Sequence, residues 1–189
     1  MDDMNIVAYD KVVQQLMNGE VGIMPTDTVY GIVARAEDKH AVQKLYALKN
    51  REKKPGTLIA ANTQQLIELG VTQSNIDKVS KWWPNPLSAV LPIDGHDYLH
   101  QGVTTLAMRV VAHPELIKLL EQTGPLITSS ANQPGEPPAV NVNQAISYFG
   151  EKIDFYVDGG TIENALPSTI VRPTNGGIEV LRQGSVKLS

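Results

Sequence analysis

Apolar positions along the chain alternate between helical and strand-like spacing. Over residues 9–18 they recur every three or four positions, which predicts a helix that ends at Gly19. The short apolar run at residues 21–24 is followed by Pro25 and predicts a strand. The same criteria predict further helices over residues 39–49, 63–69, 74–83, 113–120 and 142–149. They predict further strands over residues 57–61, 88–92, 104–111, 125–128, 153–157, 169–171 and 177–181.

Strands and helices alternate through most of the chain, and its last part is rich in strands. This order predicts an α/β domain whose sheet is mixed rather than purely parallel. Two local signals support the helix boundaries: Asn62 suits an N-cap for the helix at 63–69, and Pro114 suits a first helical position. With 189 residues and no internal repeat, residues 1–189 are expected to form a single domain that is long enough to bury a core.

The composition narrows the classes of protein and of site. Hydrophobic residues make up 42% and charged residues 19%, which is typical of a globular domain. A net charge of −4 provides no overall attraction to nucleic acid or to an anionic membrane, although a local basic cleft is compatible with it. The absence of cysteine excludes disulfides, thiolate zinc sites and cysteine nucleophiles, and it fits the cytosol. Residues 1–9 lack the apolar segment of a secretory signal, and no apolar run is long enough to span a membrane.

Three short polar stretches carry the candidate chemistry: residues 25–31 (PTDTVYG), residues 49–51 (KNR) and residues 128–132 (TSSAN). The first and third follow strand-like runs and are rich in hydroxyls, whereas the second places two cations at a helix end. Each has an ordinary alternative, because hydroxyl-rich residues also cap turns and most cations at helix ends are only solvated. Together, hydroxyls, an amide and two cations suit a ligand that carries phosphate and carboxylate groups, which indicates nucleotide chemistry.

A fourth candidate is Arg109, which interrupts the apolar run at residues 106–111. An arginine is seldom buried without a partner, so this side chain either faces a ligand cleft or forms a structural ion pair, and both interpretations stay open. Other catalytic classes lack their motifs. The four histidines have no metal-ligand spacing, and there is no glycine-rich phosphate loop and no nucleophile elbow. No metal site made of protein side chains is therefore expected.

Several motifs follow one another along nearly the whole chain. They are PTDTVYG at residues 25–31, K-x-R at 49–51, WPNP at 83–86, AMR at 107–109 with HP at 113–114, SAN at 130–132, DGG at 158–160 with STIV at 168–171, and LRQG at 181–184. Their order and spacing resemble the YrdC/TsaC family of L-threonylcarbamoyladenylate synthases, in the short form without an extra C-terminal domain. The resemblance implies a twisted sheet of parallel and antiparallel strands, flanked by helices around a deep basic cleft.

The resemblance also implies an activity. Members of this family are nucleotidyltransferases that form L-threonylcarbamoyladenylate and pyrophosphate from L-threonine, bicarbonate and ATP, with Mg²⁺ expected on the nucleotide. A separate threonylcarbamoyl-transferase complex then uses the product to make threonylcarbamoyladenosine (t6A) in tRNA, which implies a cytoplasmic protein.

The same resemblance assigns roles to individual residues. Lys49, Arg51 and Arg109 are the expected catalytic cations. The residues expected to bind ATP are Lys49, Arg51, Thr105, Ser130, Asn132 and Arg182, and those expected to bind threonine are Thr28, Arg109, Thr128 and Ser168.

The chain departs from the family pattern at several places, two of which bear on the choice of substrate. Glu52 stands where the family often has proline after K-x-R, and Pro134 replaces a serine in A-N-x-S-G. One alternative is therefore a paralogue that makes a different carbamoyl- or acyl-adenylate. The other is a non-catalytic RNA-binding module, against which the net charge of −4 and an aromatic content of 5% both argue. By composition, the proline-rich residues 133–138 are a candidate lid over the site.

Overall fold

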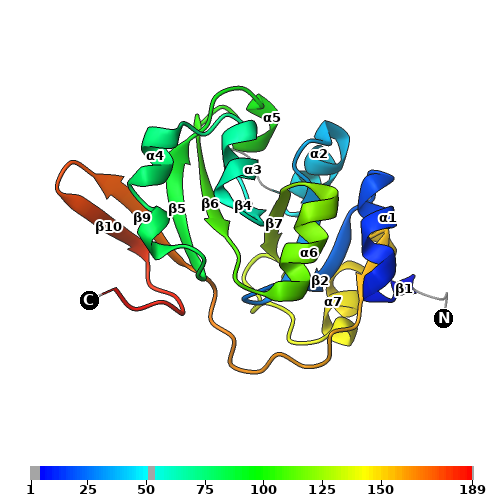
Figure 1. Ribbon diagram of the computed structural model, residues 1–189. Coiled ribbons are helices and arrows are strands. Elements are labelled where there is room, and N and C mark those ends of the chain that lie inside the picture. Colours follow the sequence, from blue (N-terminus) through cyan, green and yellow to red (C-terminus); the bar gives the residue numbers. More distant parts are fainter. Residues whose placement is uncertain (1–4, 51–53, 189) are drawn as a thin grey trace.

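A computed structural model describes residues 5–50 and 54–188, which form one sheet with helices on both of its faces (Figure 1). Among these residues the sheet has ten strands in the order β1-β8-β2-β3-β7-β4-β6-β5-β9-β10. The strands are β1 (Ile6–Val7), β2 (Gly22–Pro25), β3 (Tyr30–Arg35), β4 (Thr57–Ala60), β5 (Leu87–Pro92), β6 (Thr105–Val110), β7 (Leu126–Ser130), β8 (Phe155–Val157), β9 (Thr169–Thr174) and β10 (Gly177–Arg182).

The sheet is mixed, which confirms the prediction from the strand-rich end of the chain. The pairs β1–β8, β2–β8, β4–β6 and β5–β9 are parallel. The pairs β2–β3, β3–β7, β4–β7, β5–β6 and β9–β10 are antiparallel. Strand β7, which contains the first three residues of the TSSAN stretch, therefore lies in the middle of the sheet between β3 and β4.

The helices agree with most of the predicted ranges. The α-helices are α1 (Val12–Met17), α2 (Lys39–Leu48), α3 (Thr63–Glu68), α4 (Gln73–Asp77), α5 (Asp97–His100), α6 (Pro114–Thr123) and α7 (Val142–Phe149), and the 3-10 helices are η1 (Tyr9–Lys11), η2 (Ser80–Trp82) and η3 (Gly150–Lys152). The predicted N-cap is confirmed, because the Asn62 side chain accepts a hydrogen bond of 3.0 Å from the backbone N–H of Gln65. Pro114 is likewise found in the first turn of α6.

The predictions were wrong or incomplete at four elements. Strands β1 and β3 and helix α5 were not predicted, and the helix expected over residues 74–83 is instead two short pieces, α4 and η2. The fully buried Val79 lies between the two pieces, and its backbone is not helical, with φ −128°. β3 was missed because it is buried on both faces, so its sequence YGIVAR lacks the apolar–polar alternation of a half-exposed strand.

Two hydrophobic cores lie on opposite faces of the sheet. On one face Ile32 packs with buried residues of α2 and α7, and on the other Val33 packs with buried residues of α1 and α6. Helices α1 and α6 lie side by side (Figure 1), and on β7 and β4 the residues beneath them are Leu126 and Ile59. Helices α1 and α6 cover only part of this face of the sheet. The polar residues of β7 that follow Leu126 along the strand are not in this core, which leaves space for a cavity.

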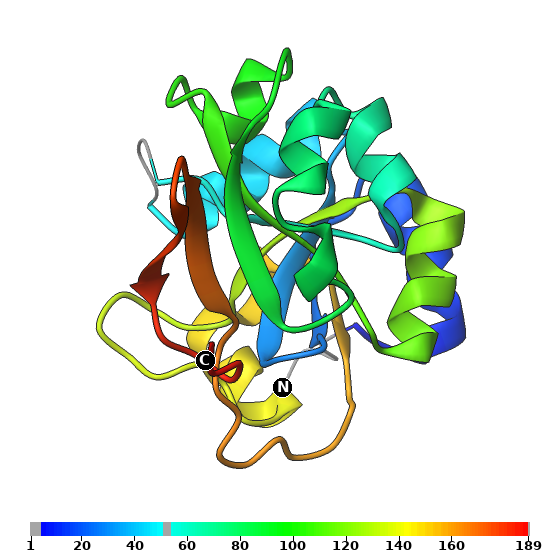
Figure 2. The same cartoon turned by 60° about the vertical axis from the view of Figure 1, so that its left-hand side comes forward.

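One long connection links the two ends of the sheet. Residues 158–168 join β8, which is second in the strand order, to β9, which is second from the other end. This segment runs along the lower edge of the molecule in Figure 1 and in Figure 2. It is anchored at its start by Tyr30, whose hydroxyl accepts from the N–H of Gly159 at 2.9 Å and donates to the carbonyl of Gly160 at 2.8 Å. The PTDTVYG and DGG motifs are therefore in direct contact.

We expect the protein to lose stability at alkaline pH through its buried tyrosines. Burial raises the pKa of Tyr156 to about 12, from a reference value of 10.0. Because the folded pKa lies above that of the unfolded chain, the stabilising contribution is complete below pH 10 and is lost as the pH rises towards 12. Melting temperatures measured across this pH range should fall less steeply for Tyr156→Phe than for the wild type. Equal slopes for the two proteins would contradict this prediction.

Candidate functional site

Most of the predicted site residues meet in one cavity of about 370 Å³. It lies on the face of the sheet that α1 and α6 leave partly uncovered. Predicted residues in its lining are Thr28, Arg109, Thr128, Ser130, Asn132, Ser168 and Arg182. They come from five separate parts of the chain, so the tertiary structure and not local sequence brings them together.

The β2–β3 turn is both a capped turn and part of the cavity wall, so the two interpretations of residues 25–31 are compatible. The Thr26 hydroxyl donates to the carbonyl of Val29 at 2.7 Å, and the Thr28 N–H donates to that hydroxyl at 3.3 Å. These bonds hold the turn by its own side chains. Thr26, Thr28, Val29 and Gly31 all line the cavity.

Arg109 and Asp27 form a bidentate ion pair at the edge of the cavity. The Arg109 Nε donates to Asp27 Oδ2 at 3.0 Å, and Arg109 Nη2 donates to Asp27 Oδ1. Both side chains are almost fully buried, with 3% of Arg109 and 6% of Asp27 exposed. Asp27 occupies one edge of the guanidinium and fixes its plane, and Arg109 also lines the cavity. Both interpretations left open by the sequence therefore apply, since the arginine has a structural partner and faces the cleft.

Strand β7 divides the three hydroxyls of TSSAN between the two faces of the sheet. Thr128 pairs with Val33 of the α1/α6 side and with Thr57, so its side chain faces the cavity, as does that of Ser130 two residues on. Ser129 lies opposite Ile32 and faces the other core, where its buried hydroxyl has no hydrogen-bond partner among the described residues. A Cβ added to the neighbouring Gly31 would lie 2.6 Å from the Thr128 hydroxyl oxygen. Glycine at this position therefore leaves the space that the hydroxyl occupies.

Lys49 is hydrogen-bonded to residues 130–132 at the end of β7, which we call the SAN loop. Its ammonium donates to the backbone oxygens of Ser130 at 3.0 Å and Asn132 at 2.5 Å, and to Asn132 Oδ1 at 2.9 Å. Ser130 Oγ also donates to Asn132 Oδ1 at 2.7 Å, and the Asn132 amide donates to the carbonyl of Glu136 at 2.8 Å. Lys49 is only 8% exposed. The cation expected at the phosphates is therefore placed against the SAN loop and helps to fix its shape.

The departure at Pro134 is explained by the turn in this loop. The N–H of Glu136 donates to the carbonyl of Gln133 at 3.0 Å, and Gly135 has φ +88°. Proline at the second position and a positive-φ glycine at the third are the preferences of a type II turn. Pro138, further along the same loop, lines the cavity. The lid role of residues 133–138 stays a prediction.

Arg182 and Ser168 close the cavity on the side of β9 and β10. The Arg182 guanidinium donates to the carbonyl of Ser168 through Nη2 at 2.8 Å, and Nη2 is 3.3 Å from the Ser168 hydroxyl oxygen. Gly184 permits this closure, because a Cβ there would lie 2.1 Å from the carbonyl oxygen of Pro167. The STIV and LRQG motifs therefore form one structural unit.

Three predicted residues are not in the lining of this cavity. Lys49 is behind it, hydrogen-bonded to Ser130 and Asn132, which do line it. Thr105 is on the same face of β6 as Arg109 but lines a separate hollow with Val90 and Arg172. Arg51 lies outside the described residues, as does Glu52. The basic character of the cleft stays a prediction, because it depends partly on Arg51.

Sequence reasoning missed Asp27 as a site residue, along with the apolar wall formed by Pro167 and Ile170. Asp27 stands within the PTDTVYG motif, so a signal was present, but its partner is 82 positions away. No local pattern identifies that partner.

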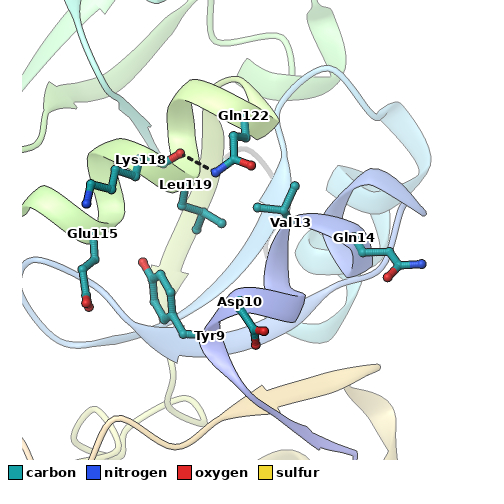
Figure 3. Close-up of a pocket in the computed structure, with 8 residues that line it drawn as sticks. All are labelled: Tyr9, Asp10, Val13, Gln14, Glu115, Lys118, Leu119 and Gln122. Carbon is teal, nitrogen blue, oxygen red and sulfur yellow. Dashed lines mark hydrogen bonds between the residues drawn. The ribbon is translucent and has the colours of Figure 1, made fainter.

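A larger hollow of about 700 Å³ lies between η1 and α1 on one side and α6 on the other (Figure 3). Tyr9 and Glu115 lie at one end of it and Gln122 donates to the carbonyl of Lys118 at 3.1 Å. It contains none of the predicted site residues, so we assign the site to the smaller cavity. Within residues 5–50 and 54–188, no three His, Asp or Glu side chains are grouped to hold a metal ion. No helix in the same described part combines the length and apolar character that a membrane span needs.

Comparison with known proteins identifies clear relatives. The Sua5–YciO–YrdC family model, described as "Telomere recombination", matches residues 14–184. A putative threonylcarbamoyl-AMP synthase of Mycobacterium tuberculosis is 38% identical over 175 residues, which cover 89% of this chain and 80% of the relative. A threonylcarbamoyl-AMP synthase of Pseudoalteromonas translucida is 33% identical over 186 residues, which cover 94% of this chain and 98% of that protein.

Solved structures agree with the sequence relatives. Sua5 of P. abyssi, solved in complex with L-threonine, has a TM-score of 0.82 and 28% identity over 96% of this chain. The chain spans only 57% of the length of that Sua5. YciO of E. coli has a TM-score of 0.81 at 21% identity, over 97% of this chain and 96% of its own, and this likeness concerns the fold alone.

Proposed function

This chain belongs to the Sua5–YciO–YrdC family, and we propose that it is a threonylcarbamoyl-AMP synthase, a nucleotidyltransferase. The proposed reaction forms L-threonylcarbamoyladenylate and pyrophosphate from L-threonine, bicarbonate and ATP. The observation that carries the proposal is the cavity in which a buried arginine, the Lys49-held SAN loop and the Arg182–Ser168 unit meet. The names of relatives that align over almost the whole chain support the same activity.

The proposed reaction brings anions together, and the charges of the cavity suit it. A carbamate made from threonine and bicarbonate must attack the α-phosphorus of ATP, and the leaving group is pyrophosphate. Catalysis of such a step depends on positioning and on neutralising charge. Arg109 has one guanidinium edge on Asp27 and lines the cavity, which suits it to hold the threonine carboxylate by its other edge. In this proposal Thr28, Thr128 and Ser168 contact the rest of the threonine moiety.

The proposed ATP subsite adjoins the threonine residues, because Ser130 is two residues from Thr128 on β7 and Arg182 is hydrogen-bonded to Ser168. Ser130 and Asn132 would contact the phosphates, with Lys49 and Arg182 supplying positive charge at the two sides. Arg51 and Thr105 keep their proposed nucleotide roles from the family motif. Mg²⁺ would arrive with the nucleotide, held by phosphates and water, since the described residues offer no metal cluster of their own.

The proposed product is an intermediate and needs a consumer. A mixed anhydride of a carbamate and a phosphate is an activated acyl donor, so a separate transferase must take the threonylcarbamoyl group. We propose that this is the complex that makes t6A in tRNA, and that the protein acts in the cytoplasm.

Pyrophosphate release tests the proposed function directly. We expect the purified protein to release pyrophosphate from ATP in the presence of bicarbonate, and only when L-threonine is added. Release that depends on a different amine would retain the adenylate chemistry and change the substrate. A folded protein that releases none with L-threonine, but binds RNA tightly and in a salt-sensitive way, would replace the proposal with the RNA-binding alternative.

A further inference from the structure

The buried hydroxyl of Ser88 is outside the cavity but is hydrogen-bonded to Ser168, which lines it. Ser88 on β5 is fully buried and does not line the cavity. It pairs with Ile170 of β9, which does line the cavity. The side chains of paired residues project from the same face of a sheet, so Ser88 is on the same face as the cavity. Among the described residues, the one hydrogen bond of its side chain runs from Ser88 Oγ to Ser168 Oγ, at 2.9 Å.

The surroundings of the Ser168 hydroxyl decide where its own hydrogen points. Ser168 Oγ accepts from Ser88 Oγ at 2.9 Å and from Arg182 Nη2 at 3.3 Å. A hydroxyl has two acceptor lone pairs and one hydrogen, so these two donors occupy both lone pairs. The hydrogen of Ser168 is then directed away from both donors. Ser168 lines the cavity, and an oxygen acceptor of a bound ligand is therefore its natural partner.

Core packing alone does not explain a serine at this position. Ser88 stands in the strand LSAVLP, where its neighbours Leu87 and Ala89 are fully buried apolar residues. A buried hydroxyl costs free energy unless it is hydrogen-bonded, and alanine would fill almost the same volume without that cost. Within residues 5–50 and 54–188, Ser168 is the one hydrogen-bond partner of the Ser88 hydroxyl. Its placement is thus coupled to the cavity wall.

We propose that Ser88 is a positioning residue of the site, which fixes the Ser168 hydroxyl as a hydrogen-bond donor to an anionic oxygen of the substrate. This inference rests on the proposed function and adds a residue that does not touch the substrate. In the proposed arrangement the oxygen belongs to the threonine moiety, because Ser168 is one of the residues proposed to contact threonine. Ser88 orients the donor by occupying one lone pair, and its polarised hydroxyl strengthens that donor.

A double-mutant cycle tests the proposal. The variants are Ser88→Ala, Ser168→Ala and the two combined, assayed for the KM of L-threonine and the KM of ATP. We expect Ser88→Ala to raise the threonine KM about three- to tenfold, which corresponds to one weakened hydrogen bond, while kcat and the ATP KM change little. In the Ser168→Ala background the same substitution should have no further effect on the threonine KM. Additive effects, or an unchanged threonine KM in Ser88→Ala, would overturn the proposal.

Two controls separate positioning from folding. Thr123→Val removes another buried hydroxyl, one that bonds the carbonyl of Leu119 in α6, and it should leave both KM values unchanged. Ser88→Cys keeps an atom at the position of the hydroxyl oxygen, but its thiol is only a weak donor, so it should behave like Ser88→Ala. If Ser88→Cys instead kept the wild-type threonine KM, contact by the atom beyond Cβ rather than the hydrogen bond would be the cause, and the proposal would fall.

Calorimetric titration of the same proteins with L-threonine keeps this question apart from the proposed function. Absence of turnover in the wild type counts against the synthase activity. A threonine affinity that falls in Ser88→Ala, and equally in Ser168→Ala, supports the positioning role whatever the turnover. A wild type that does not bind L-threonine at all, or a Ser88→Ala variant that binds it normally, would refute that role.

Discussion

Replacing Lys49 with alanine is expected to lower threonine-dependent pyrophosphate release by about 1,000-fold, the scale of losing a preorganised charged group in an active site. The ammonium of Lys49 is hydrogen-bonded to three oxygens of the SAN loop, from Ser130 and Asn132. Its loss removes a positive charge beside the proposed phosphates and frees the loop that would contact them. Steady-state assays at varied ATP concentration measure the effect.

The fold is expected to survive this change. The bonds from Ser130 Oγ and to Glu136 still hold the Asn132 side chain, so the melting temperature should fall by only a few degrees. Lys44→Ala is the matched control, because Lys44 is on α2, which ends just before Lys49, and it pairs with Asp154 at 2.5 Å, outside the lining of the cavity. It should leave turnover unchanged. Turnover by Lys49→Ala within a few-fold of wild type would exclude Lys49 from the site.

Replacing Arg109 with lysine is expected to lower kcat/KM for L-threonine by about 100-fold, which is the scale of a lost charged hydrogen-bonded pair. Lysine keeps a positive charge opposite Asp27, so the buried carboxylate is not left without a counter-ion. It lacks the second edge of the guanidinium, which we propose binds the threonine carboxylate. Assays at varied threonine concentration, together with melting temperatures, separate this effect from a loss of stability.

A matched arginine provides the control for this substitution. Arg35 on β3 pairs with Glu37 at 3.1 Å, and it lies outside the cavity. Arg35→Lys should leave kcat/KM unchanged. If Arg109→Lys lowered the melting temperature but not kcat/KM, the Asp27–Arg109 pair would be structural only.

Local signals were sufficient for the elements that depend on a single segment. Helix α7 was predicted with its observed bounds, and the N-cap of α3 at Asn62 and the early proline of α6 were correct. These features depend on residues a few positions apart, so short-range hydrogen bonding and apolar spacing are enough to specify them. Strand β3 was not predicted, because a strand buried on both faces lacks the alternation of apolar and polar residues that indicates a strand.

The sequence by itself determined the class of fold, the family and the polar stretches that contribute to the site. The tertiary structure decided which of their side chains meet. It paired Arg109 with Asp27 across 82 positions and Ser88 with Ser168 across 80, and it turned Thr128 and Ser130, but not Ser129, towards the cavity. These outcomes depend on strand order and register, which are set by burial of two cores on opposite faces of one sheet. Contacts between residues about 80 positions apart produce no periodic pattern in the sequence, so local sequence patterns do not predict them.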